Sequence, residues 1–305
     1  MRIVSLLPSS TEILYELGLG EELIAVSHDC DYPPDVANKM RLTSIDIDPA
    51  KASSKALNDW VSGKVHSGIS VYHIDQNALK EANPDLILTQ ELCEVCAPSF
   101  TEVKSACKIL DGERKIVSLE PTSLEQIMDS ILTVGRLTKR SEKAEQLVAA
   151  LRVRIKRVED LTARAPTRPE VCCLEWLDPF FSAGHWVPEI VAKAGGVDKL
   201  AQPSKPSIRI EWRQVHEYDP DILVMMPCGF NLERTIQESS TLKKYDGWQH
   251  LRAVKNSKVF AVNGSAYFNR PDPRIVSGLE IMAEILHPDL VKGTTPPDSY
   301  SRLNF

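Results

Sequence analysis

The sequence lacks any apolar run of the roughly 20 residues that a membrane-spanning helix needs. It also lacks a cluster of basic residues, because 36 Lys and Arg are scattered among 42 Asp and Glu and the net charge is −6. Nucleic acids and anionic membrane surfaces attract proteins through concentrated positive charge. We therefore expect neither a nucleic-acid partner nor insertion into a membrane.

The pattern of an export signal is missing at the amino terminus. Residues 2–7 read as a β-strand that begins at once, without a separate apolar segment of roughly 7–15 residues and without a small-residue cleavage site. The seven cysteines are an odd number, and Cys172 and Cys173 stand in apolar strand sequence, which argues against a disulfide framework. These patterns predict a reduced, cytoplasmic protein.

Common catalytic signatures are missing as well. The chain contains no Gly-x-Gly-x-x-Gly, no Walker loop, no His-Glu-x-x-His and no Gly-x-Ser-x-Gly. Glu175, Asp178 and His185 have side chains that can perform acid–base work, but neither a nucleophile nor a cofactor fingerprint accompanies them. An enzyme stays open as an alternative, and we favour a protein without enzymatic activity.

What the sequence does contain is an alternation of strand and helix patterns, which is typical of parallel sheets covered by helices. The expected strands are residues 3–7, 23–27, 86–89, 116–119, 171–176, 222–226 and 259–262. The expected helices are residues 12–17, 53–61, 75–81, 99–110, 123–161, 188–192, 212–217 and 273–286.

The two halves of the chain follow the same plan. Asn83-Pro84-Asp85 precedes the strand at 86–89, and Asp219-Pro220-Asp221 precedes the strand at 222–226, at a matching place in the order. We therefore expect an internal duplication, with two Rossmann-like α/β lobes built on parallel-strand sheets.

Between the halves, one long helix is expected to join the lobes. Residues 123–161 contain no proline and only Gly135, and their apolar residues recur at helical spacing, although the stripe slips around 138–141. A coiled-coil seam is the alternative, but the stripe does not repeat in heptads. The predicted organisation is an N-terminal lobe at 1–121, a connecting helix at 122–163, a C-terminal lobe at 168–288 and a loose tail at 289–305.

Polar and aromatic residues gather in the loops that follow the expected strands. In open α/β sheets, ligands bind beyond the carboxyl ends of the strands. Aromatic residues are only 6% of the chain, yet Trp176, Phe180, Phe181 and Trp186 stand close together, and Tyr267 belongs to another such loop. Planar rings with polar neighbours suit a large flat organic ligand. The alternative is that these rings cover the core of each lobe.

A single Cys-x-x-Cys, Cys93 and Cys96, raises the alternative of a metal site. Zinc sites are usually built from two such pairs or from a Cys pair and a His pair, so Cys30, His28 and His185 would have to complete the ligand set through the fold. Small, soft residues packed at a hinge explain the same pattern. A transition-metal or Fe–S site, in a metal carrier or an enzyme, is the second functional hypothesis.

Several stretches carry a resemblance to a known family. Ile3 to Glu12, the Asn-Pro-Asp-Leu-Ile-Leu strand and the long central helix resemble the substrate-binding proteins of cobalamin and iron-siderophore ABC transporters over roughly residues 1–288. Residues 28–34, 92–96, 175–189 and 267–271 are similar to a subgroup of cobalamin-binding-like proteins without an export signal. The resemblance implies two lobes joined by a rigid helix, with a corrinoid or metal chelate bound in a cleft between them.

From the resemblance and the strand-end loops we expect a monomeric, cytoplasmic binder of a corrinoid such as cobalamin or of another tetrapyrrole. The missing export signal argues against delivery to an ABC permease. The predicted ligand-binding residues are Tyr32, Glu91, Glu175, Trp176, Phe180, His185, Trp186, Phe230, Tyr267, Asn269 and Arg270. The predicted metal ligands of the alternative are His28, Cys30, Cys93, Cys96 and His185.

Overall fold

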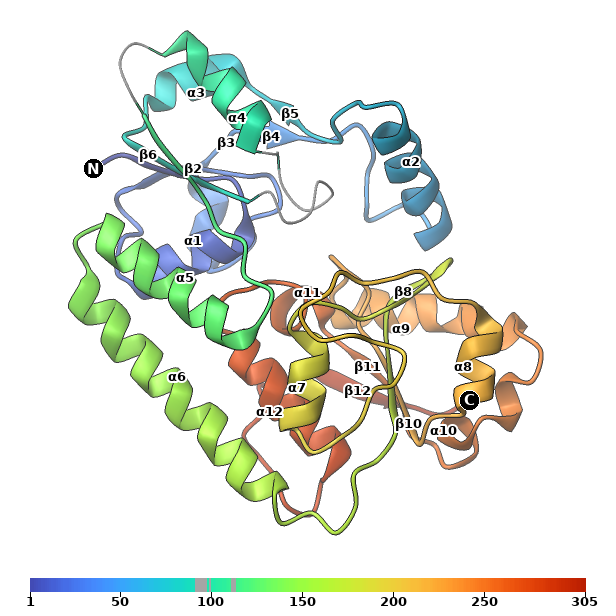
Figure 1. The fold of residues 1–305 in the computed structure, drawn as a ribbon. Helices are drawn as coiled ribbons and strands as arrows, with labels where there is room; N and C mark the ends of the chain where they lie inside the picture. Colours follow the sequence, from blue (N-terminus) through green and yellow to red (C-terminus); the bar gives the residue numbers. More distant parts are fainter. Residues whose placement is uncertain (91–97, 99, 111–113) are drawn as a thin grey trace. The chain divides into compact units, whose positions relative to one another are not determined.

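The computed structural model describes residues 1–305 apart from 91–97, 99 and 111–113, and in it the chain divides into two compact units (Figure 1). The first unit contains Met1–Pro121 and Gln126–Val148, and the second contains Thr122–Glu125 and Ala149–Phe305. Both units have the α/β architecture that the alternation of patterns predicts.

The described residues of the first unit form a five-stranded sheet in which every neighbouring pair is parallel. β1 and β6 are buried along their whole length, and both are continuous runs with β-branched and other apolar residues, as central strands covered on two faces require. In sheet order the strands are β3 (Met40–Arg41), β2 (Leu23–Val26), β1 (Ile3–Ser5), β6 (Leu86–Thr89) and β7 (Lys115–Ser118).

Helices follow the strands of this sheet. α1 begins directly after β1, where Pro8 takes a first-turn position that needs no backbone donor. A separate antiparallel pair, β4 (Thr43–Ser44) and β5 (His73–Ile74), brackets α2. The helices are α1 (Pro8–Glu16), α2 (Ser54–His66), α3 (Gln76–Ala82) and α4 (Phe100–Ala106), with the short 3-10 helices η1 (Pro34–Asn38) and η2 (Cys107–Ile109).

The sheet of the second unit is mixed rather than purely parallel. β8, β10 and β11 are parallel neighbours, but β9 and β12 pair antiparallel at the two edges. The strands, in sheet order, are β12 (Tyr300–Leu303), β11 (Val259–Val262), β10 (Ile222–Met225), β8 (Val171–Leu177) and β9 (Phe180–Ser182).

The carboxyl-terminal segment corrects an expectation, because 289–305 is not a loose tail. Residues 300–303 form β12, which pairs with β11 from Val259↔Leu303 to Val262↔Tyr300. The pairing satisfies backbone groups along the edge of β11, and Tyr300 lies against Phe260 with ring centroids 6.2 Å apart. The prolines that made this segment read as irregular all precede the strand.

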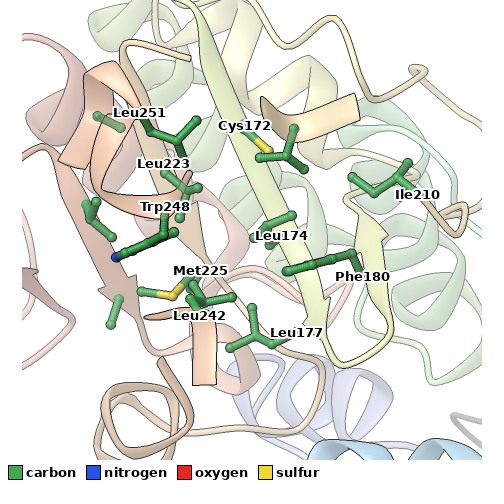
Figure 2. Packing of buried hydrophobic residues seen from close by; sticks show 14 residues of the cluster. Cys172, Leu174, Leu177, Phe180, Ile210, Leu223, Met225, Leu242, Trp248 and Leu251 are labelled. Atoms are coloured by element: carbon green, nitrogen blue, oxygen red, sulfur yellow. The ribbon is translucent and has the colours of Figure 1, made fainter. Parts of the chain in front are cut away.

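Helices cover both faces of the second sheet. In Figure 1, α7 and α12 lie on one side, and α8 and α10 lie on the other. The latter side contains a cluster of buried side chains from β8, β10 and β11 together with Trp248 and Leu251 (Figure 2). The helices are α7 (Val187–Lys193), α8 (Trp212–Tyr218), α9 (Leu232–Ser239), α10 (Arg252–Lys255), α11 (Gly264–Tyr267) and α12 (Ile275–Leu286), with η3 (Ser240–Lys244) and η4 (Trp248–His250).

The helix expected over 122–163 is interrupted, and this corrects the prediction of a single connecting helix. α5 (Leu124–Leu137) ends where Lys139 adopts φ 60° and the Arg140 N–H donates to the Gly135 carbonyl at 2.7 Å; α6 (Ser141–Thr162) then begins. A Cβ at Gly135 would lie 2.4 Å from the Ala144 Cβ, so glycine permits the close approach of the two helices. The slip in the apolar stripe around 138–141 coincides with this break.

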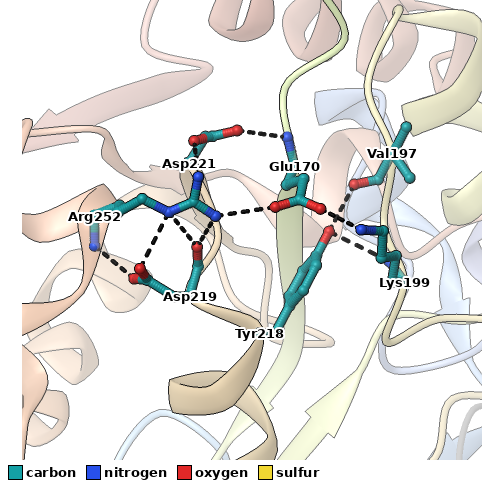
Figure 3. A network of polar contacts seen from close by, with 7 residues as sticks. All are labelled: Glu170, Val197, Lys199, Tyr218, Asp219, Asp221 and Arg252. Atoms are coloured by element: carbon teal, nitrogen blue, oxygen red, sulfur yellow. Dashed lines mark hydrogen bonds and ion pairs between the residues drawn. The ribbon is translucent and has the colours of Figure 1, made fainter.

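An ionic network joins the amino-terminal ends of β8 and β10 (Figure 3). The Arg252 guanidinium hydrogen-bonds to Asp221 at 2.8 Å, to Glu170 at 2.9 Å and to Asp219 at 3.1 Å. Lys199 pairs with Glu170 from the other side. Lys199 and Arg252 lower the pKa of Glu170. The network therefore lies at one end of the sheet, and the loops that follow the carboxyl ends of the strands lie at the opposite end.

Candidate functional site

The loops after β8, β10 and β11 meet at the carboxyl edge of the second sheet. The Cys228 N–H donates to the Glu175 carbonyl at 3.1 Å, which joins the loop after β10 to the end of β8. The Asn269 side-chain amide donates to the Met226 carbonyl at 3.2 Å, which joins the loop after β11 to the same place. Residues distant in sequence are thus brought together at the edge where parallel sheets bind ligands.

The turn before α7 presents His185 and Trp186. His185 adopts φ 52°, in the left-handed region that few residues other than glycine occupy. Its backbone N–H donates to the Lys205 carbonyl at 2.6 Å and its own carbonyl accepts from the Ser204 N–H at 2.8 Å. The His185 ring stacks on the Trp186 ring, with centroids 5.6 Å apart. The main chain on both sides of His185 is therefore held in one conformation.

Trp186 connects this turn to the loop after β11. Its side chain is 5% exposed, and its indole N–H donates to the Phe268 carbonyl at 2.7 Å. Asn269 is the next residue, so His185 and Asn269 flank the Trp186 contact. Three of the predicted ligand-binding residues, His185, Trp186 and Asn269, are thus brought together.

Two polar atoms of this group have no hydrogen-bond partner among the described residues. They are His185 Nδ1 and Asn269 Oδ1, and both are buried. Burial lowers the pKa of His185, so its ring is neutral at neutral pH and carries one donor and one acceptor nitrogen. Because an unsatisfied buried polar group costs free energy, such atoms mark a place where a ligand can complete the hydrogen bonding.

Glu175 lies near the end of β8. Its carboxylate accepts a hydrogen bond from the Gly184 N–H at 3.1 Å and another from the Ser207 side chain. Burial raises the pKa of Glu175 to about 7, against the two hydrogen bonds, which act to lower it. The carboxyl group holds the segment that leads into His185.

Other predicted contacts form a second aromatic group on the same loops. Trp176 lies against Phe230 with ring centroids 5.3 Å apart, and its indole N–H donates to the Asp178 carbonyl at 3.2 Å. Tyr267 is half-buried in α11, and the Arg274 guanidinium lies 5.7 Å from its ring centroid. Arg270 is half-buried in the loop that follows.

Phe180 belongs to the core rather than to a ligand surface. It is 3% exposed and packs against Trp212 and Tyr245, with centroids 5.8 Å and 4.8 Å away, and Figure 2 shows it among the cluster residues. The reason is the alternation of a β-strand, which turns residues 180 and 182 to one face of β9 and residue 181 to the other.

The loop after β2 contributes the predicted residues of the first unit. Tyr32 is 42% exposed and precedes a cis-proline. His28 Nδ1 lies 2.8 Å from the Thr43 hydroxyl, and its ring packs against Tyr72. Cys30 is 1% exposed, and its Sγ lies 3.1 Å from the Thr11 hydroxyl. Cys30 therefore lies inside the fold, beside the turn that starts α1.

The predicted metal ligands do not form a site in the described part of the chain. No group of three or more His, Cys, Asp or Glu among those residues is arranged to hold a metal ion. Glu91, Cys93 and Cys96 lie outside the described residues. The metal or Fe–S hypothesis on Cys30, Cys93 and Cys96 stays a prediction.

Two contributors to the site were not anticipated. Ser207 holds Glu175, and its backbone N lies 2.2 Å from the position that a Cβ on Gly184 would take. Gly278 of α12 lies against the Tyr267 carbonyl, 2.0 Å from where its Cβ would be. A glycine in the middle of an apolar helix often signals close packing, so Gly278 could have been suspected. Ser207 offered no such signal.

Known proteins are similar to this chain over most of its length. A model of the periplasmic binding protein family matches residues 3–266. The vitamin B12-binding protein of Vibrio cholerae is 25% identical over 284 residues, covering 92% of this chain and 86% of that protein. An uncharacterised ABC transporter substrate-binding lipoprotein of Bacillus subtilis is 23% identical over 301 residues, covering 95% and 81%.

Among solved structures, a periplasmic heme-binding protein from Pseudomonas aeruginosa superposes with a TM-score of 0.74 over 100% of this chain and 99% of the other. At 16% identity this similarity concerns the fold.

The cytoplasmic location expected from the amino-terminal sequence is wrong in the light of these similarities. The matching family is periplasmic, and the Bacillus relative is a lipoprotein. Both descriptions belong to proteins outside the cytoplasm. Within the described residues, no helix combines the length and apolar character needed to cross a bilayer.

Proposed function

Because this chain belongs to the periplasmic binding protein family, we propose that it is an extracytoplasmic substrate-binding protein of an ABC transporter, with a corrinoid or another tetrapyrrole as its ligand. The vitamin B12-binding relative and the heme-binding structure support this ligand class. In this role the chain binds its ligand without changing it, which agrees with the absence of a catalytic signature in its sequence.

One observation supports placing the ligand in the second unit. His185 Nδ1 and Asn269 Oδ1 are buried, lack partners in the described chain and flank the Trp186–Phe268 hydrogen bond. A macrocycle with amide or carboxylate side chains can offer a donor and an acceptor to these atoms while its flat face packs on aromatic rings. Trp176 supplies a ring on a neighbouring loop, where it lies against the buried Phe230.

The proposed contacts follow from this placement. His185, Trp186 and Asn269 form the centre, and Trp176 and Tyr267 border it. Tyr32 of the first unit, which is exposed in the loop after β2, stays a prediction from the sequence.

Titration of the purified full chain with cyanocobalamin and with hemin tests the proposal, read by the visible spectrum of each ligand and by tryptophan fluorescence. We expect saturable binding of at least one of them, weakened about tenfold or more by His185→Ala and by Asn269→Ala, since each removes about one buried hydrogen bond to the ligand. Trp212→Phe is the matched control, because Trp212 lies on α8 among the core aromatics and should leave affinity unchanged. Absence of binding to both ligands at tens of micromolar would refute the proposed ligand class.

A further inference from the structure

Asn269 is held in one orientation by hydrogen bonds from its backbone and from its side chain. Its backbone N–H donates to the Gly264 carbonyl at 2.9 Å, and its side-chain amide nitrogen donates to the Met226 carbonyl at 3.2 Å. Turning the amide over would place its oxygen against the Met226 carbonyl oxygen, and two acceptors cannot form a hydrogen bond with each other. The amide nitrogen is therefore fixed toward Met226, and Oδ1 is turned away from it.

The chain supplies no donor to the Asn269 Oδ1 atom, which is buried and has no hydrogen-bond partner among the described residues. Two N–H groups of the neighbouring loops are used elsewhere, because Ser265 donates to the Phe230 carbonyl at 3.0 Å and Phe230 donates to the Pro227 carbonyl at 3.1 Å. A Cβ on Gly264 would lie 2.6 Å from Asn269 Oδ1, so a larger residue there would crowd the atom. A ligand group that completes the hydrogen bonding of this oxygen must therefore be a donor.

His185, the other residue of this site with an unpartnered buried atom, does not impose the same demand on a ligand. Burial lowers the pKa of His185, so its ring is neutral, and Nδ1 is a donor in one tautomer and an acceptor in the other. The ring can thus form a hydrogen bond with either kind of ligand group. Asn269 Oδ1 only accepts, so Asn269 is the residue that distinguishes the two kinds.

Resting on the proposed function, we propose that Asn269 selects macrocycles whose edge carries hydrogen-bond donors over macrocycles whose edge carries only ionised carboxylates. The primary amides at the edge of a corrinoid donate through their NH₂ groups, whereas the propionates of heme are ionised at neutral pH and only accept. A carboxylate placed against Asn269 Oδ1 leaves both oxygens without a proton between them. Because an unsatisfied buried acceptor costs free energy, such a ligand binds more weakly.

A cation in the same loop acts in the opposite direction. Arg270 follows Asn269 directly, and its guanidinium attracts carboxylates through its charge. This attraction draws an acidic ligand edge toward the loop, but salt screens it. A hydrogen bond to the buried Asn269 Oδ1 depends on direct contact and is screened much less. Comparing ligands at raised salt therefore separates the contribution of Asn269 from that of charge.

The test compares two corrinoids with the same ring and metal, at neutral pH and raised salt. Cobyric acid carries primary amides at positions where cobyrinic acid carries carboxylates, and both are used in their dicyano forms. Titration of the full wild-type chain, read by the visible spectrum of each corrinoid, should show about tenfold or more higher affinity for cobyric acid, the factor expected for one unsatisfied buried acceptor. Equal affinity for the two, or tighter binding of cobyrinic acid or hemin, would overturn the proposal.

Two variants assign the preference to its residue. Asn269→Leu removes the acceptor and keeps a side chain of similar size, and Asn256→Leu is the matched control, because Asn256 is exposed at the end of α10 in the same unit. The preference for cobyric acid should fall about tenfold in Asn269→Leu and stay unchanged in Asn256→Leu. A preference that survives in Asn269→Leu would refute the role of Asn269. If circular dichroism shows that Asn269→Leu does not fold, Asn269→Ala takes its place.

The same titrations separate failure of this inference from failure of the proposed function. If both corrinoids bind with equal affinity, the proposed ligand class holds and the selectivity of Asn269 is refuted. If hemin binds and cobyric acid does not, the protein is still a tetrapyrrole binder, and the selectivity is again refuted. If neither corrinoid nor hemin binds at tens of micromolar, the proposed function is refuted and the selectivity with it.

Discussion

Replacing Gly278 by alanine should disturb both the stability and the ligand site of this protein. Gly278 lies in the middle of α12, where a Cβ would come within 2.0 Å of the Tyr267 carbonyl oxygen and 3.1 Å of the carbonyl carbon. Real Cβ atoms do not approach a backbone oxygen so closely, and the backbone cannot rotate away as a long side chain can. Either α12 or the loop after α11 must therefore move.

The magnitude follows from two opposing effects. Alanine in place of glycine inside a helix stabilises it by about 1 kcal/mol, because glycine loses more backbone freedom on folding. Overpacking of a rigid contact costs about 1–3 kcal/mol and sometimes more. Since α12 is buried over most of its length, we expect the second effect to dominate and Gly278→Ala to lower the free energy of unfolding by about 1–2 kcal/mol.

Gly63→Ala is the matched control for this prediction. Gly63 also lies inside a helix, α2, but nothing lies within 4 Å of the position of its Cβ. This variant should gain up to about 1 kcal/mol from helix propensity alone. Urea and thermal unfolding followed by circular dichroism measure both variants, and ligand titration reports whether the loop with Asn269 has moved. A Gly278→Ala protein that is as stable as Gly63→Ala and binds ligand normally would refute the packing argument.

Three further predictions concern Arg252, Glu175 and Phe180. Arg252→Ala should lower the melting temperature at neutral pH, because three carboxylates then face one another. The loss of melting temperature should shrink in high salt and disappear as those carboxylates protonate at acidic pH. A loss that does not depend on salt would contradict the network. Burial raises the pKa of Glu175 from 4.5 to about 7, so the stability due to its neutral form is complete below pH 4.5 and is lost as the pH rises through 7. The free energy of unfolding of Glu175→Gln, measured by denaturant titration, should therefore gain up to about 3 kcal/mol relative to wild type between pH 5 and pH 8. If the difference in unfolding free energy between the two proteins does not change with pH, the raised pKa is wrong. Phe180→Ala should cost about 3–5 kcal/mol of unfolding free energy, whereas a ring serving only as a ligand contact would cost little.

Much of the architecture was accessible from local sequence. Apolar runs bounded by turn residues predicted the buried strands of both sheets, because a strand covered on two faces must be apolar throughout. The strand-end positions of His185, Trp186 and Asn269 were likewise foreseeable, since parallel strands bring their carboxyl ends to one edge. The family resemblance over most of the chain is confirmed by the match to residues 3–266.

Other features depended on contacts that no local pattern encodes. The break between α5 and α6 comes with a close approach of Gly135 to Ala144, and β12 pairs with backbone groups that the edge of β11 offers. Phe180 reads like its neighbour Phe181, and only the direction in which β9 faces the core separates their environments.

The sequence by itself thus determined the α/β class, the strand-end loops and the residue types available to a ligand, because these follow from short-range periodicity and chain connectivity. Only the tertiary structure decided which of those residues meet. The Trp186 indole reaches the Phe268 carbonyl across 82 residues, and burial raises the pKa of Glu175 while hydrogen bonds from Gly184 and Ser207, outside its own strand, act to lower it. Hydrogen bonds and desolvation act through space, and this is why they could not be inferred from the order of residues alone.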